Sequence, residues 1–244
     1  FCCLAQTDMK RLIAFSSVAH MGFVMLGIST LTDFGINAAI MGMVAHGLIT
    51  GMLFFLAGSM KERYHTLEIK RLGGLLVQAP KMGWILGFCA MASLGLPGLA
   101  GFWGEFPAIL SAYNPANGLP VETFRTFMVI AALGTVLAAG YLLWLLQRSA
   151  FGTPKEEFAE DPNIYDTTKT EWIAWAPLLA LILAIGIYPN LVFRATDAAV
   201  DASLTPCLTI DADKSTHEEI ESAHCSEVYG LSDHGPDDHT ASKG

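Results

Sequence analysis

Long apolar stretches separated by short polar segments occupy the chain up to about residue 193. A helix rises 1.5 Å per residue, so about 20 apolar residues cross the hydrocarbon layer of a bilayer. Five segments reach that length, at about residues 9–30, 34–59, 82–113, 123–149 and 171–193. The pattern therefore predicts an all-α integral membrane protein with about five transmembrane helices.

The third apolar segment is too long for one straight span and contains helix-breaking residues. Pro97 has no backbone N–H to donate, and Gly98 and Gly101 have no side chains, so neighbouring groups can approach their backbone closely. Irregular backbone survives at membrane depth only where it is buried in protein or faces water. We therefore predict that this third span is a discontinuous helix broken near Pro97. The alternative is two short half-spans at 82–95 and 100–113.

Composition supports a membrane protein and excludes an ordinary soluble domain. Hydrophobic residues make up 52% of the chain, charged residues 15%, and the mean hydropathy is +0.44. The five cysteines form no CxxC pair or metal-ligand spacing, so we expect no metal and no cofactor. We expect no nucleic-acid partner.

From residue 194 onward the chain is acidic and short of large apolar residues, which predicts a mostly disordered tail, 194–244, after a transmembrane region, 1–193.

The basic residues divide unequally between the two sides of the predicted membrane region. If the five spans alternate in direction, ten lysines and arginines fall on one side and four on the other. By the positive-inside rule, the richer side is cytoplasmic and the tail lies outside. The ten residues are Lys10, Arg11, Lys61, Arg63, Lys70, Arg71, Lys81, Arg148, Lys155 and Lys169.

Three ionisable side chains are expected near the middle of the membrane. His20 and His46 lie about 16 to 18 Å from the ends where their spans begin, and Glu105 follows the predicted break. Buried ionisable groups are costly in a membrane and usually face the bundle interior or a hydrated cavity. Histidine suits proton relay, because it changes charge near neutral pH and has two ring nitrogens. We therefore predict that these three residues transfer protons, although a single membrane histidine can also serve only as a hydrogen-bond bridge between helices.

Four further polar residues are candidates for the path or for its coupling. Ser16 and Ser17 either line a hydrated path or bond back to their own helix. Lys10 and Glu62 either take part in coupling or serve as anchors at the cytoplasmic surface.

Several motifs, found in one order, resemble the antiporter-like subunits of proton-pumping NADH:quinone oxidoreductase, respiratory complex I. They are Asp8-Met-Lys-Arg-Leu-Ile-Ala-Phe-Ser-Ser-Val-Ala-His-Met-Gly22, Ala45-His-Gly-Leu48 and Leu96-Pro-Gly-Leu-Ala-Gly-Phe-Trp-Gly-Glu-Phe106. The resemblance covers about residues 4 to 193. In that family, the L and N types and the related cation/proton antiporter subunits usually carry lysine at the position of Glu105. The glutamate therefore points to the M type of the bacterial enzyme, which is equivalent to mitochondrial subunit 4.

The resemblance implies a fold of fourteen transmembrane helices, of which the five spans here look like the tenth to fourteenth. His20 and His46 would be the family's central histidines, and Glu105 the acidic residue at the distal end of its proton path. On this basis the chain is expected to be a C-terminal fragment of a multi-pass protein of the bacterial inner membrane. It would hold no redox centre or cofactor and would assemble with L-type and N-type subunits, while quinone reduction elsewhere drives transport.

Two other functions stay open at this stage. The first is a monovalent cation/proton antiporter or membrane-bound hydrogenase subunit, which would share the fold. The second is a scaffold segment that joins neighbouring membrane subunits and translocates nothing.

Overall fold

The computed structural model describes residues 2–159, 161 and 163–208. The chain divides into two compact units, Phe1–Asp197 and Ala198–Gly244. All the packing contacts discussed below lie within the first unit. The described residues form helices and loops without a strand, apart from one isolated bridge between Asp8 and Glu68.

In the part of the chain that the structure describes, eight α-helices follow a short 3-10 turn, η1, at Cys3–Ala5. They are α1 (Met9–Ser29), α2 (Asp33–Tyr64), α3 (Leu75–Gln78), α4 (Pro80–Ser93), α5 (Ala100–Ser111), α6 (Val121–Ser149), α7 (Lys169–Ile187) and α8 (Asn190–Leu208). Among the described residues, α1, α2, α6 and α7 are each long and apolar enough to cross a membrane. The predicted all-α membrane fold is therefore confirmed.

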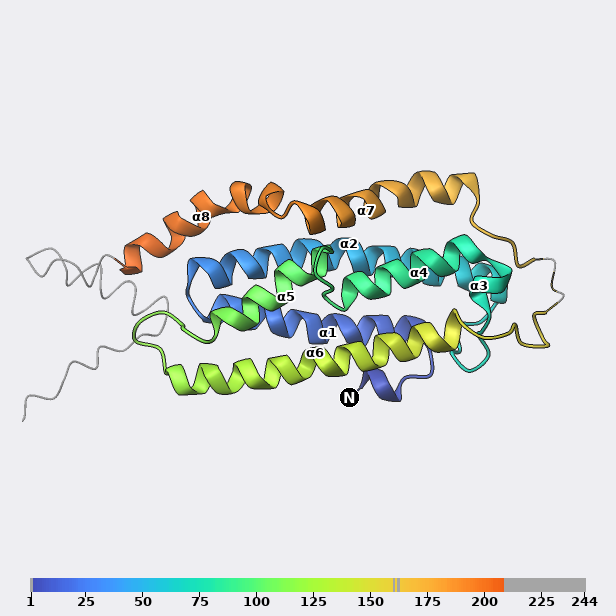
Figure 1. Ribbon diagram of the computed structural model, residues 1–244, viewed down its shortest axis with the longest axis horizontal. Coiled ribbons are helices and arrows are strands. Elements are labelled where there is room, and N and C mark those ends of the chain that lie inside the picture. The colour runs from blue at the N-terminus through green and yellow to red at the C-terminus, as the bar shows by residue number, and fades with distance from the viewer. Residues whose placement is uncertain (1, 160, 162, 209–244) are drawn as a thin grey trace, which may run out of the picture. The chain divides into compact units, whose positions relative to one another are not determined.

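The predicted third span is indeed discontinuous. Helices α4 and α5 contain 14 and 12 residues, which gives each a length of only about 18 to 21 Å, and residues 94–99 separate them. Figure 1 shows α5 continuing in the direction of α4, so the two half-helices together make one crossing. The connection uses left-handed backbone at Gly95 (φ 71°) and Gly98 (φ 91°), a conformation that glycine adopts without strain.

Side chains fix where three of the long helices begin. Asp8 accepts a hydrogen bond from a backbone N–H in the first turn of α1, and Thr32 does the same for α2. Thr168 and Glu171 form a reciprocal capping box at the start of α7. Such caps satisfy the backbone N–H groups that have no partner within the helix. The polar residues that separate the apolar stretches therefore also set the helix boundaries.

Helix α2 lies at the centre of the first unit and packs against α1, α4, α5 and α7. Its contact with α5 is a direct backbone approach. A Cβ atom added to Gly104 would lie 2.3 Å from the Cα atom of Gly42. Small residues allow membrane helices to come this close, and here they bring α5 against α2.

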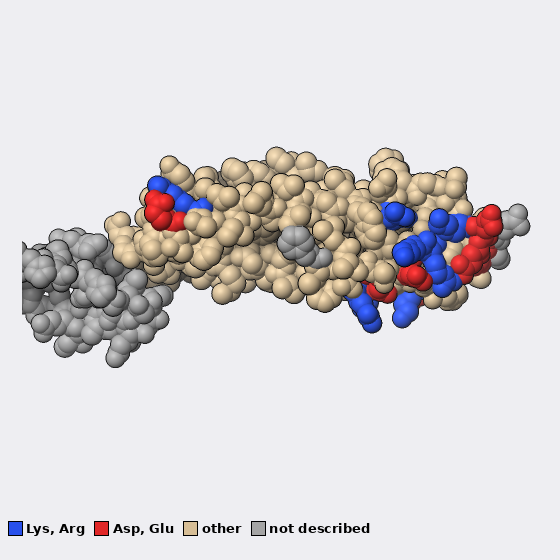
Figure 2. Space-filling model, turned by 90° about the horizontal axis from the view of Figure 1, so that it is seen from below, with Lys and Arg blue, Asp and Glu red and all other residues tan. Residues whose placement is uncertain are grey.

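Lysines and arginines gather at one end of the helices. Figure 2 shows most of those on the visible face at this end, then a middle region without charged side chains, and a smaller group of basic and acidic side chains at the opposite end. The end richer in basic residues is the one at which α1, α4 and α7 begin and α2 and α6 finish (Figure 1). The ten basic residues grouped by the sequence therefore share one end, called the basic end below. Outside the spans, an ion pair with Glu157 at this end raises the pKa of Arg71, mainly through a hydrogen bond.

The fifth span and the tail differ from the prediction. Helix α7 ends at Ile187, shortly before Pro189, and α8 begins at Asn190. Residues 194–208, which we predicted as part of the tail, are therefore helical. The four alanines of this stretch favour helix, but the composition averaged over the whole acidic tail hid this signal. The rest of the predicted tail, 209–244, lies outside the described residues.

Candidate functional site

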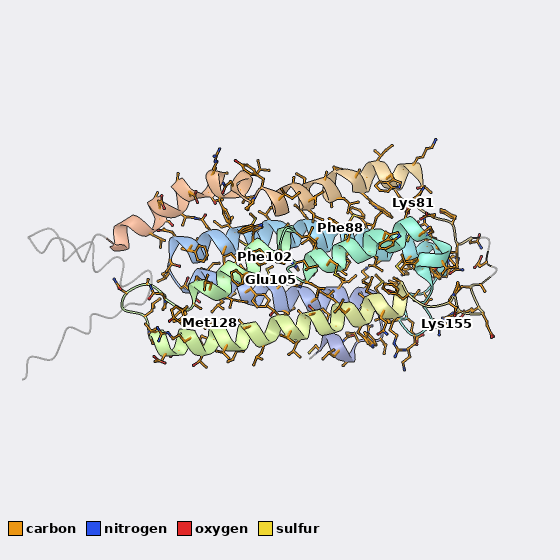
Figure 3. All side chains as sticks on the ribbon, in the orientation of Figure 1. Lys81, Phe88, Phe102, Glu105, Met128 and Lys155 are labelled. Carbon is orange, nitrogen blue, oxygen red and sulfur yellow. The ribbon has the colours of Figure 1, made fainter. Side chains whose placement is uncertain are left out.

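Two of the predicted residues meet directly. The Nδ1 atom of His20, on α1, lies 2.6 Å from the Oε1 atom of Glu105, on α5. Both side chains are shielded, with exposures of 5% and 13%. In Figure 3, Glu105 lies on α5 near the break between the half-helices. A contact this short between an imidazole and a carboxyl group is a hydrogen bond, and one proton occupies it.

His20 also faces a hydroxyl and a second histidine. Its Nε2 atom lies 3.3 Å from the Oγ atom of Ser93, the last residue of α4. The His46 ring, on α2, lies 5.1 Å from the His20 ring between centroids. Thr50, one turn further along α2, has its hydroxyl 3.1 Å from the Nε2 atom of His46. The structure therefore brings all three predicted proton-transfer residues into one cluster, which we call the central cluster.

A small cavity of about 20 Å3 lies among these side chains. A cavity needs roughly 10 to 15 Å3 to hold a water molecule, so this one has room for about one. It combines the three ionisable groups and one hydroxyl with apolar walls. Its lining residues are His20, Phe23, Val24, Gly42, Ala45, His46, Ile49, Ser93, Gly101, Gly104 and Glu105.

The helix break creates the space that Glu105 occupies. A Cβ atom on Gly95 would lie 3.1 Å from the Oε2 atom of Glu105, so the carboxylate lies almost against the backbone of the break. A Cβ atom on Gly101 would lie 2.1 Å from the carbonyl oxygen of Ala92, at the end of α4. The two half-helices can therefore meet at this angle only because glycine stands at these positions.

Helix α7 supports the break from another side. The indole Nε1–H of Trp103 donates to the carbonyl oxygen of Gly186, at 2.8 Å. A Cβ atom on Gly186 would lie 2.4 Å from the carbonyl oxygen of Gly98 and 2.5 Å from the Cα atom of Leu99. The backbone of α7 at Gly186 therefore lies in direct contact with the backbone of the break at Gly98 and Leu99.

The four further candidates lie outside the central cluster. The hydroxyls of Ser16 and Ser17 both donate to the carbonyl oxygen of Ile13, at 2.7 and 3.3 Å, which is the back-bonding alternative. Lys10 and Glu62 are exposed at the basic end. Lys10 lies about 15 Å along α1 from His20, so it does not contact the cluster.

Sequence reasoning missed Ser93, Thr50 and an ion pair at the basic end. Thr50 stands four residues after His46, a spacing that places two side chains on one helix face and could have revealed it. Ser93 is visible only once the fold is known. Arg63, which is 1% exposed, bonds Glu171 through both terminal nitrogens, at 2.8 and 3.0 Å.

The central cluster has the groups needed to move a proton across several helices. His20 can exchange a proton with Glu105 at Nδ1 and with Ser93 or a cavity water at Nε2, because the two ring nitrogens face opposite partners. The His46 ring is too far for direct transfer, but it lines the same cavity. A broken membrane helix with buried ionisable groups at the break is typical of ion-translocating membrane proteins.

The comparisons with known proteins agree with this class. The chain belongs to the family described as "NADH:quinone oxidoreductase/Mrp antiporter, TM", whose sequence profile matches residues 1–139. It is therefore part of a multi-pass membrane protein.

Similar proteins include two curated relatives. The chain is 43% identical over 189 residues to NADH-quinone oxidoreductase subunit M of Rhodobacter capsulatus, covering 78% of this chain and 35% of that protein. It is 40% identical over 199 residues to NAD(P)H-quinone oxidoreductase chain 4 2 of Synechococcus sp. (strain JA-3-3Ab), covering 81% and 37%. The chain thus spans little more than a third of the length of these relatives.

Two solved structures share the fold. Respiratory complex I from Thermus thermophilus contains a chain that matches with a TM-score of 0.72 and 31% identity, covering 83% of this chain and 40% of that one. The Mrp complex from Dietzia sp. DQ12-45-1b matches with a TM-score of 0.67, covering 84% and 44%, but its 19% identity supports a common fold alone.

Proposed function

We propose that this chain forms part of an M-type, proton-translocating membrane subunit of NADH:quinone oxidoreductase. In this proposal, protons move through the central cluster while quinone reduction elsewhere in the complex supplies the energy. The observation that carries the proposal is the 2.6 Å contact between His20 and Glu105, buried beside a helix break and next to His46.

The proton moves in three transfers within the cluster, toward Glu105 as the terminal acid. His46, when protonated, passes its proton to a water in the cavity, and that water passes a proton to the Nε2 atom of His20. The resulting imidazolium then releases its Nδ1 proton to the Glu105 carboxylate. Each transfer leaves one extra proton on the path and changes which group holds it. The imidazolium and the carboxylate stabilise each other before the last transfer, because both groups are shielded from solvent.

Three observations support the M type and its setting. The residue at position 105 is glutamate. Relatives are named as subunit M or chain 4 of quinone oxidoreductases. The ten basic residues gathered at one end favour a cytoplasmic location for that end. We therefore propose that the protein sits in a bacterial inner membrane beside L-type and N-type subunits, with no redox centre of its own.

The experiment that tests this function is Glu105→Gln in the complete homologous subunit, assembled in its complex. Glutamine keeps the size and a hydrogen-bonding group but cannot release a proton at neutral pH. We expect NADH-driven proton uptake by inverted vesicles, measured per electron, to fall severalfold in assembled complexes. Glu156→Gln, at an exposed carboxylate between α6 and α7, is the matched control and leaves the ratio unchanged.

Two outcomes would refute the proposal. An unchanged proton-to-electron ratio in assembled Glu105→Gln complexes would favour a scaffold role. Sodium uptake in exchange for protons, abolished by the same substitution, would favour a cation/proton antiporter.

A further inference from the structure

Ser93, the last residue of α4, directs its hydroxyl differently from the other buried serines of the described helices. Each of those serines donates its hydroxyl to a carbonyl oxygen of its own helix at 2.7 Å, as serines in helices commonly do. They are Ser16, Ser111 and Ser149, of which the last two also stand at the end of their helices. The Ser93 hydroxyl, although its side chain is only 4% exposed, has its partner among the described residues in the Nε2 atom of His20, at 3.3 Å. Its orientation therefore serves His20 and not the end of α4.

The two ring nitrogens of His20 are contacted by opposite halves of the broken span. Glu105, on α5, lies 2.6 Å from Nδ1, and Ser93, on α4, lies 3.3 Å from Nε2. In a continuous helix these two residues would stand about 18 Å apart along the axis, too far for one side chain to meet both. The break at residues 94–99 therefore allows a single imidazole ring to bridge the two half-helices.

The Ser93 hydroxyl occupies the position from which a proton would enter Nε2. A ring nitrogen that carries no proton accepts a hydrogen bond in the plane of the ring, and here the Ser93 hydroxyl is the donor that faces it. The His20 side chain is only 5% exposed, so little of its ring is open to another donor. Ser93 also lines the cavity of about 20 Å3 that has room for one water. A water in that cavity can donate to the Ser93 oxygen, because a hydroxyl that donates still has lone pairs with which to accept.

The end of α4 favours a positive charge on His20. The last carbonyl groups of a helix carry partial negative charge, which stabilises a cation placed within about one turn. Because Ser93 is the final residue of α4 and contacts the ring, an imidazolium at His20 lies beside this helix end as well as beside the Glu105 carboxylate. The charged form of the ring is therefore stabilised from both half-helices.

We propose that Ser93 is a relay residue that carries the proton from the cavity water to the Nε2 atom of His20. This inference rests on the proposed function and specifies how its second transfer occurs. The protonated water gives a proton to the Ser93 oxygen while the Ser93 hydroxyl gives its own proton to Nε2. One O–H bond forms on Ser93 as another breaks, so Ser93 is neutral before and after. When His20 has passed its Nδ1 proton to Glu105, the Ser93 oxygen accepts from the Nε2–H, because a hydroxyl can act as donor or acceptor.

The first test is Ser93→Ala in the complete subunit within its assembled complex. We expect the proton-to-electron ratio of inverted vesicles to fall as far as it does in Glu105→Gln, because both substitutions interrupt the same sequence of transfers. Ser111→Ala and Ser149→Ala are the matched controls. Each removes the hydroxyl of a buried serine at the end of a helix, where the hydroxyl bonds to its own helix, and leaves the ratio unchanged.

Two variants of similar shape separate the hydroxyl from its packing. Ser93→Thr keeps a hydroxyl, whereas Ser93→Val carries a methyl group in its place, and both side chains are branched at Cβ. The relay predicts that assembled Ser93→Thr complexes pump and that Ser93→Val complexes of equal unfolding temperature do not. A purely structural role predicts equal ratios for the two, and that result would overturn the relay. If the added bulk prevents assembly of both, Ser93→Ala decides alone.

Failure of this inference is distinguishable from failure of the function on which it rests. Normal pumping by assembled Ser93→Ala complexes, while Glu105→Gln abolishes pumping, means that the cavity water reaches Nε2 without help and overturns the relay alone. Normal pumping by Glu105→Gln as well overturns the proposed function itself.

Discussion

Replacing Gly104 by alanine should disturb the central cluster through the backbone, without touching an ionisable group. The new Cβ atom would lie 2.3 Å from the Cα atom of Gly42, about 1 Å less than the 3.4 Å at which ordinary contact begins. The atom that it meets belongs to the backbone of α2, so a side-chain rotation cannot relieve the clash. Helices α2 and α5 must therefore move apart by about 1 Å.

This displacement should affect both stability and transport. Overpacking of this kind costs about 1 to 3 kcal/mol. Glu105 follows Gly104 directly, so the shift of α5 would also displace its carboxylate from His20 and lengthen the 2.6 Å contact, by up to about 1 Å. Misplacement of reacting groups by 1 Å can lower a rate by about a hundredfold. We therefore expect a large loss of proton uptake per electron.

The assay measures proton uptake by vesicles and the unfolding temperature of the purified complex. Two glycines on the facing helix α2, Gly42 and Gly58, provide controls. Gly58→Ala should change neither quantity, because a Cβ atom there meets nothing within 4 Å. Gly42→Ala should have a small effect, because its nearest contact is a side-chain methyl of Val24 at 3.3 Å. If Gly104→Ala is as stable and as active as Gly58→Ala, the close approach of α2 and α5 does not position Glu105.

Two further predictions concern the basic end, and both are measured as unfolding of the purified protein in detergent. Arg63→Ala should lower the unfolding free energy by about 3 kcal/mol, because it leaves the shielded Glu171 carboxylate without its cation, and adding Glu171→Ala should restore part of the loss. A double variant that is destabilised by the sum of the two single effects would contradict this coupling. Thr168→Ala should cost about 1 kcal/mol by removing one half of the capping box of α7, whereas Thr126→Ala, at an exposed threonine within α6, should cost less. Equal effects of the two threonine substitutions would argue against the cap.

The sequence predicted the transmembrane architecture well, because the bilayer imposes a simple rule on length and polarity. Pro97 and its neighbouring glycines located the break correctly, since no regular helix can continue through them. The expectation that His20, His46 and Glu105 lie at a similar depth was also realised, because rise per residue converts position in the chain directly into depth.

Properties that depend on how the helices rotate and pack were not predictable. Depth alone does not say that His20 faces Glu105, and Ser93 joins them only because α4 ends beside α1. The Arg63 and Glu171 pair was equally hidden, since an arginine at a helix end usually indicates no more than a surface anchor.

The contact between Gly186 and the break has a consequence for electrical insulation. The interruption between α4 and α5 leaves backbone carbonyl groups that attract water and cations. A continuous file of water past Glu105 would let ions cross the membrane. Because Gly186 has no side chain, α7 lies directly on Leu99 and the Gly98 carbonyl, and Trp103 fastens the contact. Helix α7 thus covers one flank of the broken helix with protein, which is the condition under which irregular backbone persists inside a membrane.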